Sequence, residues 1–151
     1  MRTNDQMSDI QRAVSTFNEG YSCSQAILST YGKRLGLMRE LAFKIAGAFG
    51  GGMARMGKTC GAVTGALMVI GLKYGMVDLA DKDAKEKTYA MVHEFMDRFT
   101  AIHGSIECKE LLGCDLSTVE GRLHAKEQNL VVTICPELVQ HAAEILEELL
   151  F

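Results

Sequence analysis

The sequence predicts an all-α fold, with residues 1–151 packed as a single-domain bundle of about six to eight helices. Three observations predict it: apolar residues recur three and four positions apart, proline occurs once in 151 residues, and one short run alone, 130–134, resembles a strand. A single strand cannot form a sheet, so helices must supply the core. A hydrophobic content of 48% is enough for one core, and the length is short for two domains.

The helices follow one another along the chain, separated by glycine-rich or polar segments. The 81–87 segment carries mostly charged residues and should stay in solvent, while the apolar stripe of its helix continues through 92–102. The C-terminal stripe is the most regular, and the expected helix starts after the only proline. The expected helical segments are 7–17, 23–35, 39–49, 60–74, 106–113, 117–128 and 136–150, together with a fifth helix in chain order that carries the apolar face 92–102.

Charge and hydropathy exclude several classes of protein. The net charge of −3 comes without a block of lysine and arginine, so a nucleic-acid-binding protein is not expected. The longest apolar stretch, 60–72, is shorter than the roughly 20 residues that span a bilayer. The N-terminus is polar and lacks the apolar core of a signal peptide, so we expect a cytoplasmic protein. Nine methionines give soft packing surfaces that would suit a homodimer.

Five cysteines in a reducing compartment indicate metal, catalytic or redox chemistry rather than structural disulfides. Cys23 lies between Ser22 and Gln25 in a capping-box pattern, which places it in the first turn of a helix. Cys60 follows Thr59, a plausible helix cap, and is also expected in a first turn.

The remaining cysteines follow different local signals. Ser105 precedes the short helix that contains Cys108, and the Cys135-Pro136 pair predicts Cys135 as a helix cap because proline favours the first helical position. Cys114 lies beyond the end of its short helix and could be a resolving thiol, although an incidental role is favoured.

A thiol at a helix N-terminus should ionise more easily than usual. The helix dipole stabilises an anion there by about 0.3–2 kcal/mol, which lowers a thiol pKa by about one unit. The thiolate is both the nucleophile and the metal ligand. Arg55 and Lys58 would add positive potential near Cys60. The alternative remains open that each cysteine is a small apolar filler in the core.

The 60–74 helix begins with a face that has almost no side chains. Gly61 and Gly65 are four residues apart and share that face with Ala62. Glycine inside a helix costs up to about 1 kcal/mol relative to alanine, so something should approach this face closely. Tight packing of another helix is the favoured explanation, and a cofactor or a partner thiol approaching Cys60 is the functional one.

Residues 52–59 match the phosphate-binding pattern G-x-x-x-x-G-K-[ST] at every fixed position. The pattern requires a buried strand before it, whereas the 41–49 segment reads as a helix. No later strand supplies an aspartate for magnesium. Nucleotide binding is therefore not expected.

The histidines give weaker signals than the cysteines. His103 continues an apolar stripe and could act as a base or a ligand, but a partly buried structural role is favoured. His141 has no partner that the sequence identifies.

The ordered cysteine pattern resembles the C_GCAxxG_C_C family of small redox-active proteins, some of which are selenoproteins. The resemblance rests on a cysteine after Gly-Tyr-Ser, then Cys-Gly-Ala-x-x-Gly, then Cys-x-x-Leu-Leu-Gly, and a last cysteine that opens the C-terminal helix. It covers roughly 17–150. It implies that the family cysteines are Cys23, Cys60, Cys108 and Cys135, with Gly61, Ala62 and Gly65 completing the central motif. Cys114 is extra to the pattern.

Two chemistries fit a site built from these four cysteines. In one, Cys60 is an activated thiolate that forms a transient disulfide with Cys23 or Cys108, and an unknown redox partner exchanges electrons with it. In the other, all four thiolates bind an iron–sulfur cluster or zinc. A third hypothesis belongs to another class, a non-catalytic helical accessory protein that binds a partner. The cofactor, if there is one, is not identified by the sequence.

Overall fold

The computed structural model describes residues 6–151, which form eight α-helices and no β-strand. This confirms the all-α prediction. An isolated antiparallel bridge joins Thr59 to Glu107. The helices are α1 (Asp9–Glu19), α2 (Cys23–Arg34), α3 (Arg39–Ala46), α4 (Gly61–Tyr74), α5 (Lys82–His103), α6 (Cys108–Leu112), α7 (Val119–Glu127) and α8 (Leu130–Leu150).

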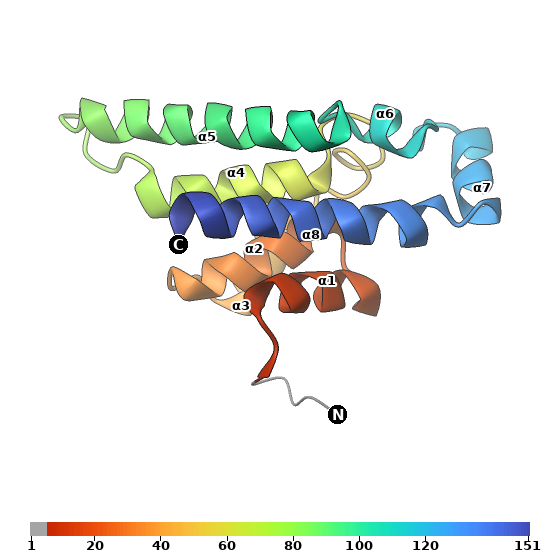
Figure 1. Cartoon of the computed structure of the whole chain (residues 1–151), viewed down its shortest axis with the longest axis horizontal. Coiled ribbons are helices and arrows are strands. Elements are labelled where there is room, and N and C mark those ends of the chain that lie inside the picture. Colours follow the sequence, from red (N-terminus) through yellow and green to blue (C-terminus); the bar gives the residue numbers. More distant parts are fainter. Residues whose placement is uncertain (1–5) are drawn as a thin grey trace.

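The helices pack in three approximate layers (Figure 1). The long α5 forms one outer layer, α4 and α8 lie between, and α2 with α1 and α3 forms the other side. Helix α8 contacts α1, α2, α4 and α5, and its N-terminal half extends toward α6 and α7. Helices far apart in sequence therefore meet at the α6–α7 end of the bundle.

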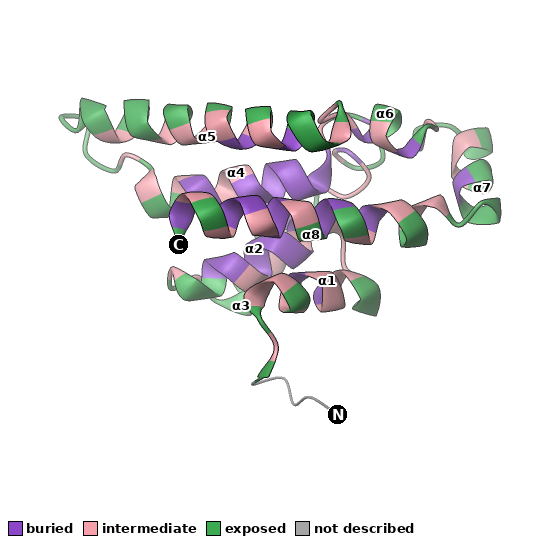
Figure 2. Ribbon diagram, viewed as in Figure 1, coloured by how far each residue is buried: buried purple, intermediate pink, exposed green. Residues whose placement is uncertain are grey.

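Helix α4 is central because both of its sides are apolar. Residues 61–66 are all buried, and Val69 and Ile70 continue the buried run. Helix α5, in contrast, buries one face through Phe95 and Phe99 and exposes the other (Figure 2). This is the burial pattern expected of a central helix and of an amphipathic surface helix, respectively.

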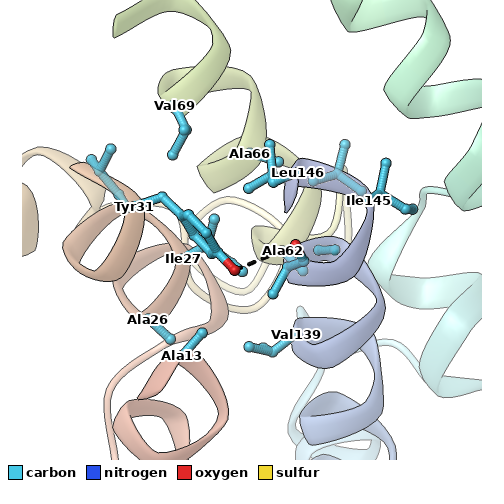
Figure 3. Packing of buried hydrophobic residues seen from close by; sticks show 14 of the residues in the cluster. Ala13, Ala26, Ile27, Tyr31, Ala62, Ala66, Val69, Val139, Ile145 and Leu146 are labelled. Atoms are coloured by element: carbon cyan, nitrogen blue, oxygen red, sulfur yellow. Dashed lines mark hydrogen bonds between the residues drawn. The ribbon is translucent and has the colours of Figure 1, made fainter. Parts of the chain in front are cut away.

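A tyrosine connects α2 to α8 through the core (Figure 3). Tyr31 is fully buried, and its hydroxyl lies 3.4 Å from the Ala143 carbonyl oxygen and 3.2 Å from Glu147 Oε1. Burial, followed by the nearby Glu147 carboxylate, raises the pKa of the Tyr31 hydroxyl well above its usual range. Arg34 also pairs with Glu147 at 3.1 Å, so the same carboxylate contacts both Tyr31 and Arg34 of α2.

The predicted start of the C-terminal helix is wrong. Helix α8 begins at Leu130, so the strand-like run 130–134 is helical and Pro136 lies inside the helix. Strand propensity is a preference for a half-buried pleated surface, and no second strand is present among the described residues to supply one. Cys135 is consequently inside α8 and is not its cap.

Other helix ends differ by small shifts. Ser22 and Gln25 form the predicted capping box before Cys23. Cys60 is itself the N-cap of α4, replacing Thr59 in the expected role. Cys108 is the first residue of α6, preceded by Glu107 as cap. Helix α3 ends at Ala46 rather than at residue 49. No helix among residues 6–151 is both long and apolar enough to cross a membrane.

A histidine pair that the sequence did not identify joins α5 to α8. His141 Nδ1 lies 2.8 Å from His103 Nε2, and Phe99 packs on the His103 ring with 4.7 Å between ring centroids. The hydrogen bond requires one nitrogen to donate and the other to accept, so at least one nitrogen must lack a proton. Burial, and then the neighbouring His141, lower the pKa of His103.

This pair predicts a loss of stability in mild acid. Because the pKa of His103 is lower in the folded state, unfolded chains bind more protons, and the free energy of unfolding falls as pH decreases through about 6.5. Chemical denaturation across this range should show a slope that His103→Gln flattens and that His93→Gln, at an exposed position, leaves in place. Equal slopes in the wild type and His103→Gln would contradict this interpretation.

Candidate functional site

A cavity of about 900 Å³ opens at the end of the bundle where α2 and α4 begin and α6 packs against α8. Its lining combines neutral polar groups, glycine backbone, aliphatic side chains and three basic residues. The structure brings all four sequence-predicted cysteines to this one cavity. They are Cys23, Cys60, Cys108 and Cys135.

The start of α2 positions Cys23. The Ser22 hydroxyl accepts from the backbone N–H of Gln25 at 3.3 Å, and the Gln25 side chain accepts from the Ser22 N–H at 3.0 Å. Ser24, fully buried, donates its hydroxyl to the Ala46 carbonyl at 3.0 Å and ties this turn to the end of α3. These bonds fix the direction in which Cys23 leaves the helix.

Backbone hydrogen bonds between two loops hold Cys60 beside Cys108. The N–H of Cys60 donates to the Ile106 carbonyl at 2.7 Å, and the N–H of Cys108 donates to the Lys58 carbonyl at 2.6 Å. The bridge between Thr59 and Glu107 lies between these two bonds. Two helix starts that are distant in sequence thus form one wall of the cavity.

The bare face of α4 packs against the first turn of α2. A Cβ on Gly65 would lie 3.0 Å from the Ser24 carbonyl oxygen, and a Cβ on Gly61 would lie 3.1 Å from Cys23 Cβ. Ala62 is completely buried in the core. Of Gly61, Ala62 and Gly65, only Gly61 lines the cavity. Close helix packing therefore accounts for these small residues, and it also brings Cys23 against the start of α4.

The loop before α4 makes an unusual left-handed turn. Five consecutive residues, Gly51 through Arg55, have φ angles between 51° and 69°. This conformation costs roughly 1–2 kcal/mol at each of Met53, Ala54 and Arg55. Strain of this kind persists where the surroundings enforce it, often at functional sites. The turn carries Arg55 to the rim of the cavity and places Gly52 directly against Cys108.

Backbone N–H groups that would have to bind a phosphate donate instead to carbonyls of the same loop. The N–H groups of Arg55, Gly57 and Lys58 donate to the carbonyls of Gly50, Gly51 and Gly52 at 3.0, 3.2 and 2.9 Å. The element before the loop is the helix α3, as the sequence predicted, and not a strand. The phosphate-loop pattern therefore lacks both its structural context and its amide donors.

For Cys60 and Cys108, burial has a larger effect on the thiol pKa than the position at a helix N-terminus. It raises the pKa of Cys60 to about 11, although hydrogen bonds from the N–H groups of Ala62 and Val63 act in the lowering direction. It also raises the pKa of Cys108 to about 12, with nearby cysteines adding to the rise. The prediction that helix N-termini would activate these thiols is wrong, because the cost of desolvating a thiolate exceeds the dipole's benefit.

Cys135 is the exception, because a neighbouring thiol supports its charge. A hydrogen bond from Cys23 lowers the pKa of Cys135, against the opposing effect of burial. The same bond and burial raise the pKa of Cys23. Cys23 and Cys135 therefore titrate as a pair, in which the pKa of Cys135 lies on the lower side and that of Cys23 on the higher side. Sequence reasoning selected Cys60 as the activated thiol and missed this pair, since it depends on the packing of α2 against α8.

Cys114 lies outside the cavity lining but close to the site. It is partly exposed, and charge interactions connect it to Cys135 and Cys108. Burial, followed by the adjacent Asp115, raises the pKa of Cys114. This fits its expected position past the end of the α6 helix.

The donor geometry does not fit a metal ion. Within residues 6–151, no group of three or more cysteine, histidine, aspartate or glutamate side chains is arranged so that it could hold one. The zinc or iron–sulfur alternative therefore lacks a preassembled set of ligands among the described residues.

The fold and the cavity define a small helical protein whose cysteines gather from α2, α4, α6 and α8. The chain belongs to the C_GCAxxG_C_C family, described as "Putative redox-active protein", whose family model matches residues 21–149. The comparison with curated proteins and the comparison with solved structures gave no match.

Proposed function

We propose that this protein is a thiol–disulfide oxidoreductase in which Cys135 is the nucleophile and Cys23 is the resolving thiol. The observation that carries the proposal is that Cys23 and Cys135 line one cavity and interact there, with the pKa of Cys135 lowered and that of Cys23 raised. A catalytic dithiol needs such a difference in pKa, because the attacking sulfur must be a thiolate while the resolving sulfur stays protonated until the second step. The cavity beside the pair supplies room for a substrate.

The reaction has two exchange steps. The Cys135 thiolate attacks one sulfur of a substrate disulfide, forming a mixed disulfide, and the first substrate thiolate leaves. Cys23 then gives up its proton, attacks Cys135 Sγ, and releases the second thiolate. The Cys23 proton and one from solvent convert the two leaving thiolates to thiols. The substrate gains two electrons, and the cysteine pair loses two as it forms a disulfide.

The other two cysteines have a different role in this proposal. With pKa values of about 11 and 12, Cys60 and Cys108 stay protonated at neutral pH. They are neutral neighbours that add no negative charge beside the Cys135 thiolate. A return to the reduced state needs a thiol reductant, so the proposed setting is a reducing compartment such as the cytosol.

Disulfide mapping tests the proposal. Fully reduced protein is mixed with one equivalent of hydroxyethyl disulfide, quenched with acid, alkylated and digested for mass spectrometry. The expected product is a Cys23–Cys135 disulfide with Cys60 and Cys108 alkylated. A Cys60–Cys108 product would show that the redox pair is wrongly assigned, and four fully alkylated thiols would overturn the proposal.

A further inference from the structure

The charged residues around the cavity are all of one sign. Its lining includes Arg55, Arg122 and Lys126 and no aspartate or glutamate. The chain as a whole has the opposite balance, with 19 acidic and 16 basic residues. A cavity with only positive charges in an acidic protein is therefore a local feature that general composition does not explain.

These cations form no ion pair with a carboxylate of the described residues. Arg122 donates one hydrogen bond, to the Leu116 carbonyl at 2.8 Å, which holds it in place without cancelling its charge. Arg55 and Lys126 are exposed residues whose side chains reach the rim. The positive potential is thus directed at whatever enters the cavity.

Separate elements bring the three charges together. Arg55 comes from the left-handed turn before α4, while Arg122 and Lys126 lie four residues apart on α7 and so share one face of that helix. This arrangement explains the strained turn: its left-handed backbone costs energy, but it places Arg55 at the cavity. The four thiols and the three cations line the same space.

We propose that the substrate of this site is a small anionic disulfide, with carboxylate or phosphate groups bound by Arg55, Arg122 and Lys126. This rests on the proposed thiol–disulfide function and adds the substrate's chemical class to it. The volume of about 900 Å³ matches the upper range for small-molecule sites, which favours a low-molecular-weight disulfide over a folded protein. The cations hold the anionic groups while the sulfur–sulfur bond faces Cys135.

An anionic disulfide reagent and a neutral one test the substrate class. Dithiobis(nitrobenzoate) is an anionic aromatic disulfide, and dithiodipyridine is a neutral one. Their rates with Cys135 are compared in a Cys114→Ser background, which removes the partly exposed extra thiol. The charge variant is Arg55→Gln/Lys126→Gln, which spares the hydrogen-bonded Arg122. The matched control, Lys33→Gln/Lys82→Gln, removes the same charge from exposed positions outside the cavity.

The charge variant should slow the anionic reagent by on the order of tenfold at low ionic strength and leave the neutral reagent's rate unchanged. The difference should shrink between about 0.01 and 0.15 M salt as the Debye length falls from about 30 to 8 Å. The control should keep both rates. Oxidised glutathione, a carboxylate-bearing disulfide, should show the same dependence on the charge variant.

The outcomes separate the two proposals. If Cys135 in the wild type reacts with neither reagent, the thiol–disulfide function itself fails. If it reacts with both, but the charge variant leaves the anionic rate unchanged or slows both reagents equally, the function stands and the anionic substrate class is overturned.

Discussion

Replacing Cys135 with serine is expected to slow disulfide reduction by roughly a thousandfold or more, the largest effect of any single substitution in this chain. A serine hydroxyl is not ionised at neutral pH and cannot form a disulfide, so both the attack and the covalent intermediate are lost. The measurement is the rate of thiol release from hydroxyethyl disulfide under a thiol reductant. Cys114→Ser should retain the wild-type rate, because Cys114 lies outside the cavity lining.

The two variants of Cys23 separate its roles. Both remove the resolving thiol, so both should accumulate a mixed disulfide on Cys135. They differ in hydrogen bonding: Cys23→Ser keeps a donor toward Cys135, whereas Cys23→Ala does not. The midpoint of the pH–rate profile for the first attack should therefore rise toward the ordinary thiol value of about 8.5 in Cys23→Ala, and less in Cys23→Ser. Identical midpoints in the wild type and Cys23→Ala would show that Cys23 does not stabilise the thiolate.

Much of the fold was accessible from local signals in the sequence. The capping box around Cys23 and the apolar stripes of α5 and α8 depend on residues within a few positions of one another. Such patterns determine helices directly. Even the error at residues 130–134 had a local origin, because β-branched residues and Pro136 suggested a later helix start than tertiary packing imposes.

The chemistry of the site was less accessible, because it depends on contacts between distant segments. The backbone N–H groups of Ala62 and Val63 are local to Cys60 and lower its pKa, but burial depends on the whole fold and outweighs them. The lowered pKa of Cys135 arises from Cys23, more than a hundred positions earlier. The cationic rim likewise combines a loop before α4 with a face of α7. The sequence pattern selected four cysteines that line one cavity, but it did not single out Cys135 as the one whose pKa is lowered.

Substituting Gly52 with alanine is expected to damage the site more than any other change to its backbone. An added Cβ would lie 2.6 Å from Cys108 Cβ, 2.7 Å from the Lys58 amide nitrogen and 2.8 Å from its carbonyl oxygen. Two of these atoms are backbone atoms: the Lys58 carbonyl accepts from the Cys108 N–H, and the Lys58 N–H donates to the Gly52 carbonyl. The substitution should therefore break the wall formed by Cys60 and Cys108.

The energetic cost has two parts that a matched variant separates. Gly52 has φ +69°, and so alanine there costs roughly 1–2 kcal/mol for the left-handed conformation and about 1–3 kcal/mol more for overpacking. Gly104 has φ +80° and would have no neighbouring atom within 4 Å of an added Cβ, so Gly104→Ala incurs the first part alone. Urea unfolding should show the larger loss for Gly52→Ala, together with faster alkylation of Cys108. Equal losses and unchanged alkylation would mean that the turn can relax away from Cys108, and that close packing of Gly52 does not hold the cysteine wall together.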